Sequence, residues 1–553
     1  MNDFSHLPAT GLTGLTRHWR QDLVSGFMVF LLALPLCLGI SMASGFPPAS
    51  GIISAIVGGL LVSRINGSYV TINGPAAGLI VVIYSAVQAL GEGDPMAGYR
   101  YTLAAIVVAS ALQVFMGLYK AGQLSSFFPT AVVHGMLAAI GLIIIAKQFH
   151  VMLGVTPDFA SILATIMQIP HSLMNPEPEI AFIGLSGLGI LIAWPLMKYP
   201  QLKKIPAPVV VLLTGMGLGQ YFGLQHEHIH LFLLDDAYLA QHGHLIQAKF
   251  LVDIPDQVLS LFSFPDFSKA MTIEFWGAVV SICLVGSLET LLSAAAVDKL
   301  DPYRRTSDLD RDLAAVGLGN LVAGCLGGLP MIAEIVRSSA NVDNGAQTGW
   351  SNFFHGLIFL LFLLLFPHVI HSIPLASLAA LLVYTGYRLA SPKTFKHVLA
   401  VGLDQLGLFI ITIAGVLATD LLLGVALGIG AKLAIQGLRG VWLNNMFKIH
   451  FDIRRPDRHT IVVKILGSAL FSNFLPLKKA LTELESGKTI VFNFSDGYLI
   501  DHTVMEFIDD FSRNYRARGG KCLQIGHALE KFSDHKLAAR LMTQDDRKPS
   551  AKG

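Results

Sequence analysis

Residues 327–337 read GGLPMIAEIVR and interrupt an apolar segment of the chain. The two glycines remove the conformational penalty for a break, and Pro330 suits the first turn of a new helix, where its missing N–H is not needed. Glu334 and Arg337 follow three residues apart, which places them on one face of that helix. A helix that begins inside a bilayer points unpaired N–H groups inward, which is tolerated only where the backbone lines a polar cavity. An anion is the natural occupant.

A weaker copy of this pattern occurs early in the chain, where residues 67–77 read GSYVTINGPAA. A short polar run that favours a strand meets Gly74 and Pro75, and the sequence then becomes apolar again. Two interrupted apolar segments in corresponding halves of a chain are the best sequence indicator of a transporter's substrate site.

The composition indicates a protein embedded mostly in a membrane. Hydrophobic residues make up 53%, charged residues 14%, and the mean hydropathy is +0.59, whereas soluble domains carry about a quarter charged residues. The formal net charge of +2 argues against a nucleic-acid partner, which needs a clustered basic face. The four cysteines show no disulfide or metal-ligand spacing, and no catalytic triad or phosphate loop is present, so we expect no enzyme, metal or organic cofactor.

Apolar stretches long enough to cross a bilayer recur along the chain, each needing about 20 residues. The first, from Leu23, is followed by many more and is interpreted as a span rather than a signal peptide. The expected spans are 23–42, 49–64, 75–91, 100–118, 127–147, 178–197, 206–222, 271–297, 311–327, 330–342, 352–369, 374–390, 404–418 and 420–438. This gives a polytopic α-helical transport domain over 23–440 with seven segments in each half, 23–222 and 271–440, the third of each being the interrupted one. Because seven is odd, the halves form an inverted repeat.

Basic residues in short loops orient the chain, since such loops face the cytoplasm. This rule places the segment 1–22 and the C-terminus in the cytoplasm, and the insert 223–270 outside. The basic residues concerned are Arg17, Arg20, Lys120, Lys198, Lys203, Lys204, Lys299, Arg304, Arg305, Lys393 and Lys396. The insert contains alternating histidines that could bind zinc, but no acidic or cysteine partner has ligand spacing, so incidental histidines are favoured. They are His226, His228, His230, His242 and His244.

The character of the sequence changes after Arg439. Residues 452–543 are richer in charge and alternate between strand and helix patterns, which predicts a small cytoplasmic α/β domain. The expected strands are 460–465, 488–494 and 521–525, and the expected helices are 475–485 and 502–518. The tail 544–553 has the composition of a disordered segment.

Five short motifs, in order, resemble those of the sulfate permease (SulP) family over nearly the whole chain. They lie at 22–48 (DLVSG, LPL and GFPP), 128–136 (FPTAVVHGM), 286–293 (GSLETLLS), 317–330 (GLGN through GLP) and 499–503 (LIDHT). The last resembles the start of a helix in the sulfate-transporter and anti-sigma-antagonist (STAS) domain.

The resemblance implies core and gate domains, a homodimer, and an anion site between the third and tenth half-helices. The anion would meet the backbone at Ala76, Ala77, Ala333, Glu334 and Ile335, beside the cation of Arg337. In bicarbonate-type members the positions matching Glu289 and Ser293 contribute to a sodium site, which implies Na⁺ or H⁺ as a coupling ion.

The chain departs from the family where Met331, Ile332 and Glu334 replace small or hydroxyl residues. Glu334 either caps its helix or must be protonated or paired before an anion enters. Glu289 either couples transport or forms a salt bridge, for instance with Arg337, because an ionised carboxylate in hydrocarbon is costly. Arg337 either attracts the anion or simply pairs with Glu334.

The favoured interpretation is a secondary active transporter of a small anion in the bacterial inner membrane, working by alternating access and coupled to sodium or protons. Bicarbonate is the first candidate, sulfate the second and a dicarboxylate the third. The alternatives are a dicarboxylate/proton symporter, an uncoupled anion channel, and a membrane sensor that signals to a partner protein through the STAS domain.

Overall fold

A computed structural model describes most of the chain. The described residues are 8–122, 128–155, 162–197, 205–224, 250–254, 258–485, 487–517, 519–526, 530–531, 535 and 537–541. The predicted disordered tail, the five histidines of the insert, and Lys198, Lys203 and Lys204 lie outside them. The chain divides into two compact units: a larger unit of 6–122 and 140–389, and a smaller unit that contains 123–139 and 390–553.

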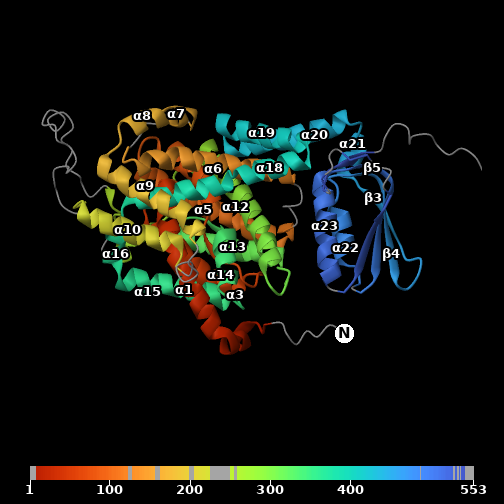
Figure 1. The fold of residues 1–553 in the computed structure, drawn as a ribbon, viewed down its shortest axis with the longest axis horizontal. Helices are drawn as coiled ribbons and strands as arrows, with labels where there is room; N and C mark the ends of the chain where they lie inside the picture. Colours follow the sequence, from red (N-terminus) through yellow and green to blue (C-terminus); the bar gives the residue numbers. More distant parts are fainter. Residues whose placement is uncertain are drawn as a thin grey trace, which may run out of the picture. The chain divides into compact units, whose positions relative to one another are not determined.

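Helices dominate both units, and each of the fourteen predicted spans overlaps a helical segment of the described chain (Figure 1). Six of these helices are long and apolar enough by themselves to cross a membrane. The segments of the first half are α1 (Gly11–Ala43), α2–η2–α3 (Ala49–Val57, Gly58–Val62, Ser63–Ile65), η3–α4 (Ala77–Leu79, Ile80–Gly91), α5 (Pro95–Leu118), α6 (Thr130–Met152), α9–η5 (Pro178–Ala193, Trp194–Leu196) and α10 (Ala207–Tyr221).

The second half repeats this order. Its segments are α12 (Ile273–Leu300), α13 (Leu309–Cys325), α14 (Ile335–Asp343), α15–α16 (Trp350–Leu365, Pro367–His371), α17 (Leu375–Leu389), α19 (Leu403–Ala418) and α20 (Leu421–Leu438). Further short helices in the described chain, among them α7 (Ile162–Met167), α8 (Ile169–Met174), α18 (Pro392–Val401) and α21 (Leu443–Phe447), lie where the sequence predicted connecting segments. In the smaller unit, the ring of Phe395 in α18 packs edge-on against the ring of Phe409 in α19, with their centres 4.6 Å apart. The basic residues of α18 made this apolar contact hard to predict from the sequence.

The two interrupted segments meet each other as strands. β1 (Asn73–Pro75) and β2 (Met331–Ala333) pair antiparallel, with Asn73 opposite Ala333 and Pro75 opposite Met331. The prediction that Pro330 opens the tenth helix is therefore wrong: a strand follows it, and α14 begins only at Ile335. The physical reason is that extended backbone within a bundle must bond to something, and each break supplies the other's partner.

The C-terminal α/β fold lies within the smaller unit, and each of its predicted strands and helices overlaps an observed one. A sheet in the order β3-β4-β5-β8-β7, with β6 also paired to β5, is covered on one face by α22 and α23 (Figure 1). The elements are β3 (His450–Arg454), β4 (Thr460–Ala469), α22 (Leu475–Thr482), β5 (Thr489–Ile500), α23 (His502–Ala517), β6 (Lys521–Ile525), β7 (Glu530–Lys531) and β8 (Arg540–Leu541). Alternate residues of β4 and β5, such as Ile461, Val463, Phe492 and Phe494, are buried in one apolar core.

Close helix packing in the larger unit depends on glycine. Gly59 lies in η2, a π-helical stretch between α2 and α3, where its backbone crosses Gly356 of α15. A β-carbon at Gly59 would overlap the backbone of Gly356 and the carbonyl of Asn352. Small residues allow this approach between helices in a membrane, and the π-helical turn is of a kind often found near functional sites.

We therefore expect Gly59→Ala to destabilise the protein, by about 1–3 kcal/mol for overpacking. The matched control is Gly277→Ala in α12, where nothing lies within 4 Å of the added carbon and a helical alanine is favoured over glycine. Thermal unfolding of the purified proteins in detergent should show a lower midpoint for Gly59→Ala and no decrease for Gly277→Ala. Equal midpoints for Gly59→Ala and the unmodified protein would contradict this packing.

Candidate functional site

Side-chain hydrogen bonds hold the paired strands β1 and β2 in place within the larger unit. Asn320 of α13 accepts a bond from the Met331 N–H (2.6 Å) and donates to the Met331 carbonyl (3.1 Å). On the other side, the Ile72 N–H donates to Ser338 Oγ (2.9 Å), and Asn341 donates to the Val70 carbonyl (2.8 Å). The backbone N–H and carbonyl groups around the breaks are therefore paired partly by buried amide and hydroxyl side chains, in addition to the pairing between the two strands.

Two helical segments begin directly after these strands. One starts at Ala77 and continues into α4, and the other is α14, which starts at Ile335. The Glu334 N–H donates to the Ile72 carbonyl (2.9 Å), so it is not available to a ligand. First-turn N–H groups lack partners within their own helix, which leaves Ile335, Val336 and Arg337 as the amides that α14 can offer.

Two carboxylates lie at the start of the α4 segment, where the sequence predicted an anion. Glu289 of α12 is 5% exposed, and neither of its carboxylate oxygens has a hydrogen-bond partner. Its carboxylate lies against Gly78, where any side chain would overlap it. The Glu334 carboxylate interacts with the backbone N–H of Ala77 and, through space, with Glu289. The protein's own carboxyl groups therefore occupy the positive end of this helix.

The plainer roles considered for Glu334 and Glu289 match this geometry only in part. Glu334 stands at the N-cap position of α14 but makes no side-chain cap hydrogen bond there; its carboxylate turns to the other half-helix instead. Arg337, which is 1% exposed, donates from Nη2 to the Pro75 carbonyl (3.3 Å). Among the described residues it forms no ion pair within 4.0 Å with Glu334 or Glu289, but it interacts with Glu334 through space.

Two residues that sequence reasoning passed over also belong to this site. His355 of α15 is fully buried, has no hydrogen-bond partner at either ring nitrogen, and interacts through space with Arg337. Cys37 of α1 is also fully buried and interacts with the Arg337 side chain. A single histidine or cysteine in an apolar run is too common a signal to identify either one in advance.

Ser293 is one turn beyond Glu289 on α12, and both are 5% exposed. Such oxygen atoms are the ligands that hard cations prefer. No group of three or more His, Cys, Asp or Glu residues in the described part of the chain is arranged to hold a metal ion. A sodium site at Glu289 and Ser293 therefore stays a prediction.

The family model for the sulfate permease family matches residues 19–441. This chain belongs to the sulfate permease family. Members of the family are multi-pass membrane transporters and not enzymes, which confirms both of those predictions.

Relatives and solved structures agree with this assignment. The chain is 24% identical over 519 residues to the putative sulfate transporter YvdB of Bacillus subtilis, covering 92% of this chain and 91% of YvdB. It is 24% identical over 419 residues to the bicarbonate transporter BicA of Picosynechococcus, covering 75% of this chain and 69% of BicA. The transmembrane domain of a cyanobacterial BicA superposes with a TM-score of 0.61 at 21% identity, covering 75% of this chain and 98% of that one. The structure of SLC26A9 superposes with a TM-score of 0.65 at 12% identity, covering 93% of this chain and 85% of that one. The predicted fold class is thereby confirmed.

The role of Asn320 can be tested by removing its side chain. Asn320→Ala leaves the Met331 N–H and carbonyl buried without partners, which costs about 1–3 kcal/mol for each unsatisfied group. We expect a lower unfolding midpoint in detergent than for Asn344→Ala, which removes only an exposed bond to the Ala340 carbonyl. Indistinguishable midpoints would show that Asn320 does not hold β2.

Proposed function

We propose that this protein is a secondary active transporter that carries a small inorganic anion, bicarbonate or sulfate, by alternating access. The observation that carries the proposal is the convergence of two broken segments on charged groups: the buried Glu289 and Arg337 and the half-buried Glu334 lie where the helices restart. Helix starts and a guanidinium attract an anion, and a site between two half-helices suits a moving core.

Bicarbonate is the first candidate substrate and sulfate the second. BicA, named as a bicarbonate transporter, and YvdB, named as a putative sulfate transporter, match this chain at the same identity, so identity does not separate them. Glu289 followed by Ser293 on one face of α12 supports the cation-coupled bicarbonate arrangement. A dicarboxylate remains the third candidate.

The carboxylates supply a physical reason for coupling. An incoming anion must displace or approach two negative groups, Glu289 and Glu334, in a site with little water, and like charges there repel strongly. A proton or a sodium ion bound with the substrate offsets that repulsion. Uptake of the anion is thereby linked to a cation gradient, which a symporter requires.

Topology, location and assembly complete the proposal. Basic short loops support cytoplasmic N- and C-termini, and the bacterial relatives support the inner membrane. A homodimer and a STAS domain at 452–543 that binds a partner protein follow from the family resemblance. An uncoupled channel would give flux that no cation gradient alters, whereas a sensor would give no flux at all.

The substrate and the coupling ion can be identified together in proteoliposomes. We expect saturable uptake of labelled bicarbonate, driven by an imposed sodium or proton gradient, to exceed uptake of labelled sulfate and fumarate. Uptake of sulfate alone would exchange the order of the two candidates. Absence of flux for all three anions would contradict the transport proposal.

The pH and cation dependence of uptake should change when a carboxylate is neutralised. Glu334→Gln removes one negative charge from the start of the α4 segment, so uptake should depend less on proton and sodium gradients. The matched control is Glu274→Gln, an exposed carboxylate on the same helix as Glu289. If Glu334→Gln keeps the full dependence of the unmodified protein, Glu334 takes no part in coupling.

Arg337 should set the affinity for the anion. A charge-assisted hydrogen bond contributes about 1.5–3 kcal/mol, so Arg337→Gln should raise the KM for the anion by about tenfold or more. Arg388→Gln, an exposed arginine at the end of α17, is the control and should leave the KM unchanged. An unchanged KM for Arg337→Gln, in protein that unfolds at the normal temperature, would exclude direct attraction.

A further inference from the structure

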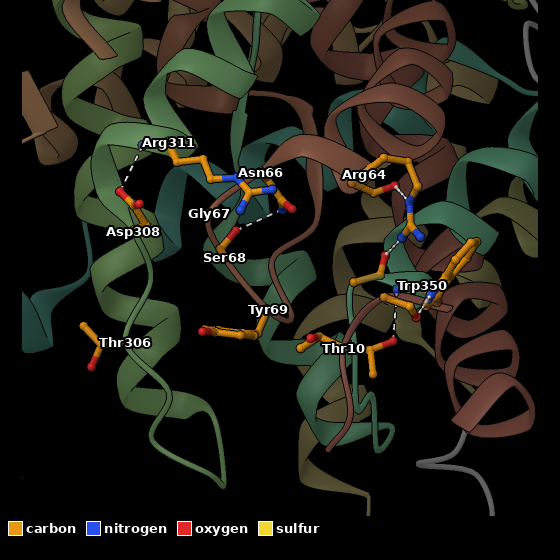
Figure 2. Close-up of a pocket in the computed structure, with 14 residues that line it drawn as sticks. Thr10, Arg64, Asn66, Gly67, Ser68, Tyr69, Thr306, Asp308, Arg311 and Trp350 are labelled. Atoms are coloured by element: carbon orange, nitrogen blue, oxygen red, sulfur yellow. Dashed lines mark hydrogen bonds between the residues drawn. The ribbon is translucent and has the colours of Figure 1, made fainter. Parts of the chain in front are cut away.

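A cavity lies in the larger unit, and neither the two carboxylates nor Arg337 of the transport site line it. Its volume is about 530 Å³, within the range of sites for small organic ligands. Four elements form it: the start of α1, the end of α3 with the loop that follows, the start of α13 and the start of α15 (Figure 2). None of its lining residues belongs to the site described above.

Two guanidinium groups face this cavity from different elements. On one side, Arg311 of α13 lies beside Asn66, and its Nε donates to the Ile65 carbonyl (2.9 Å) (Figure 2). On the other side, Arg64 lies 3.5 Å from the centre of the Trp350 ring and donates from Nη2 to the Gly349 carbonyl (3.0 Å). These bonds hold the side chains in place, much as supporting bonds fix groups in a built site.

Both arginines keep donors for a ligand. Within the part of the chain that the structure describes, neither Nη1 of Arg64 nor the two terminal nitrogens of Arg311 have a hydrogen-bond or ion-pair partner. A planar guanidinium with free terminal N–H groups matches the oxygen atoms of a phosphate or carboxylate. The starts of α13 and α15 add the positive ends of two helices to the same cavity.

Asp308 distinguishes this cavity from a site for a bare anion. Its carboxylate lines the cavity and accepts a bond from the Arg311 backbone N–H (3.1 Å). With Arg64 and Arg311 the lining carries one net positive charge, together with hydroxyl groups from Thr10, Ser68 and Thr306. An acceptor carboxylate beside two cations suits a ligand that brings hydroxyl donors as well as a negative group.

We propose that this cavity binds a phosphate ester that carries free hydroxyl groups. Arg64 and Arg311 bind the phosphate, and Asp308 accepts hydrogen bonds from the hydroxyls. A bicarbonate or sulfate ion fills only a small part of the cavity, so it is not the expected ligand. The same chemistry is found in a free sugar or glycerol phosphate and in the headgroup of phosphatidylglycerol.

The loop that lines the cavity continues along the chain into β1 of the transport site. A ligand bound in the cavity can therefore act on that site through this loop. Asn66 donates to Ser68 Oγ (3.0 Å), and Ser68 donates to Asp312 Oδ1 of α13 (2.8 Å). The same loop continues into β1, which begins at Asn73 and pairs with β2. A ligand that holds residues 66–69 therefore holds the segment that positions the first half-helix.

The first test measures binding of sn-glycerol 3-phosphate to the purified full-length protein by calorimetry in detergent. We expect saturable binding that Arg311→Gln weakens about tenfold, the effect of losing one charge-assisted contact. Arg388→Gln, the same change at an exposed arginine outside the cavity, should bind as the unmodified protein does. Asp308→Asn should have the opposite effect on the affinity for inorganic phosphate and strengthen its binding several-fold. The substitution removes a carboxylate that repels the phosphate, while the asparagine still caps α13.

The second test distinguishes the two sources of the ligand. The protein is placed in nanodiscs that contain phosphatidylglycerol or only phosphatidylcholine, and the lipid retained on extraction is measured by native mass spectrometry. Retention of phosphatidylglycerol that Arg311→Gln reduces and Arg388→Gln does not identifies the headgroup as the ligand, and binding of glycerol phosphate alone identifies a free metabolite. If Arg311→Gln and Arg388→Gln behave alike with both probes, the proposal is overturned. Neither measurement depends on transport, so its outcome is separate from that of the proposed function.

Discussion

The antiparallel pairing of β1 with β2 is the constraint on which the transport site depends. A helix interrupted within a membrane exposes N–H and carbonyl groups that hydrocarbon cannot satisfy. Here two interruptions from distant parts of the chain bond to each other, with Gly74 opposite Ile332. Asn320 holds Met331 at the start of β2, and Asn341 holds Val70 in the loop just before β1. Because each strand needs the other, the two half-helices that follow are fixed as one arrangement.

The architecture was largely predictable because its signals are long and repeated. Apolar runs near the length of a bilayer mark spans regardless of their neighbours, and glycine with proline marks a break in both halves. The α/β domain was equally clear, since alternation in 460–465 and 488–494 is strong. The small strands β3, β7 and β8 were not predicted, because two to five residues carry too little periodicity to register.

The details of the site were harder to predict because they depend on contacts between distant segments. Glycine and proline announce that a helix stops, but they do not say whether a strand or a new helix follows. Each of the two strands forms only because it pairs with the other. The residues of one strand carry no information about where the other lies in the fold. For the same reason Glu334 was assigned to a helical face with Arg337, whereas its carboxylate turns to Ala77 in the other half. His355 and Cys37 became visible only through their burial next to Arg337.

The charge of the site has a consequence for the energetics of a transport cycle. Glu289 and Glu334 together outnumber the single cation of Arg337, so the unloaded site bears one surplus negative charge when both carboxylates are ionised and none when one of them is protonated. Carrying one elementary charge across the full membrane potential changes the energy by about 2.3 kcal/mol for every 100 mV. On the proposed mechanism, the return of the unloaded core is an electrical event only in the state with both carboxylates ionised, and protonation of one of them makes that step independent of membrane voltage.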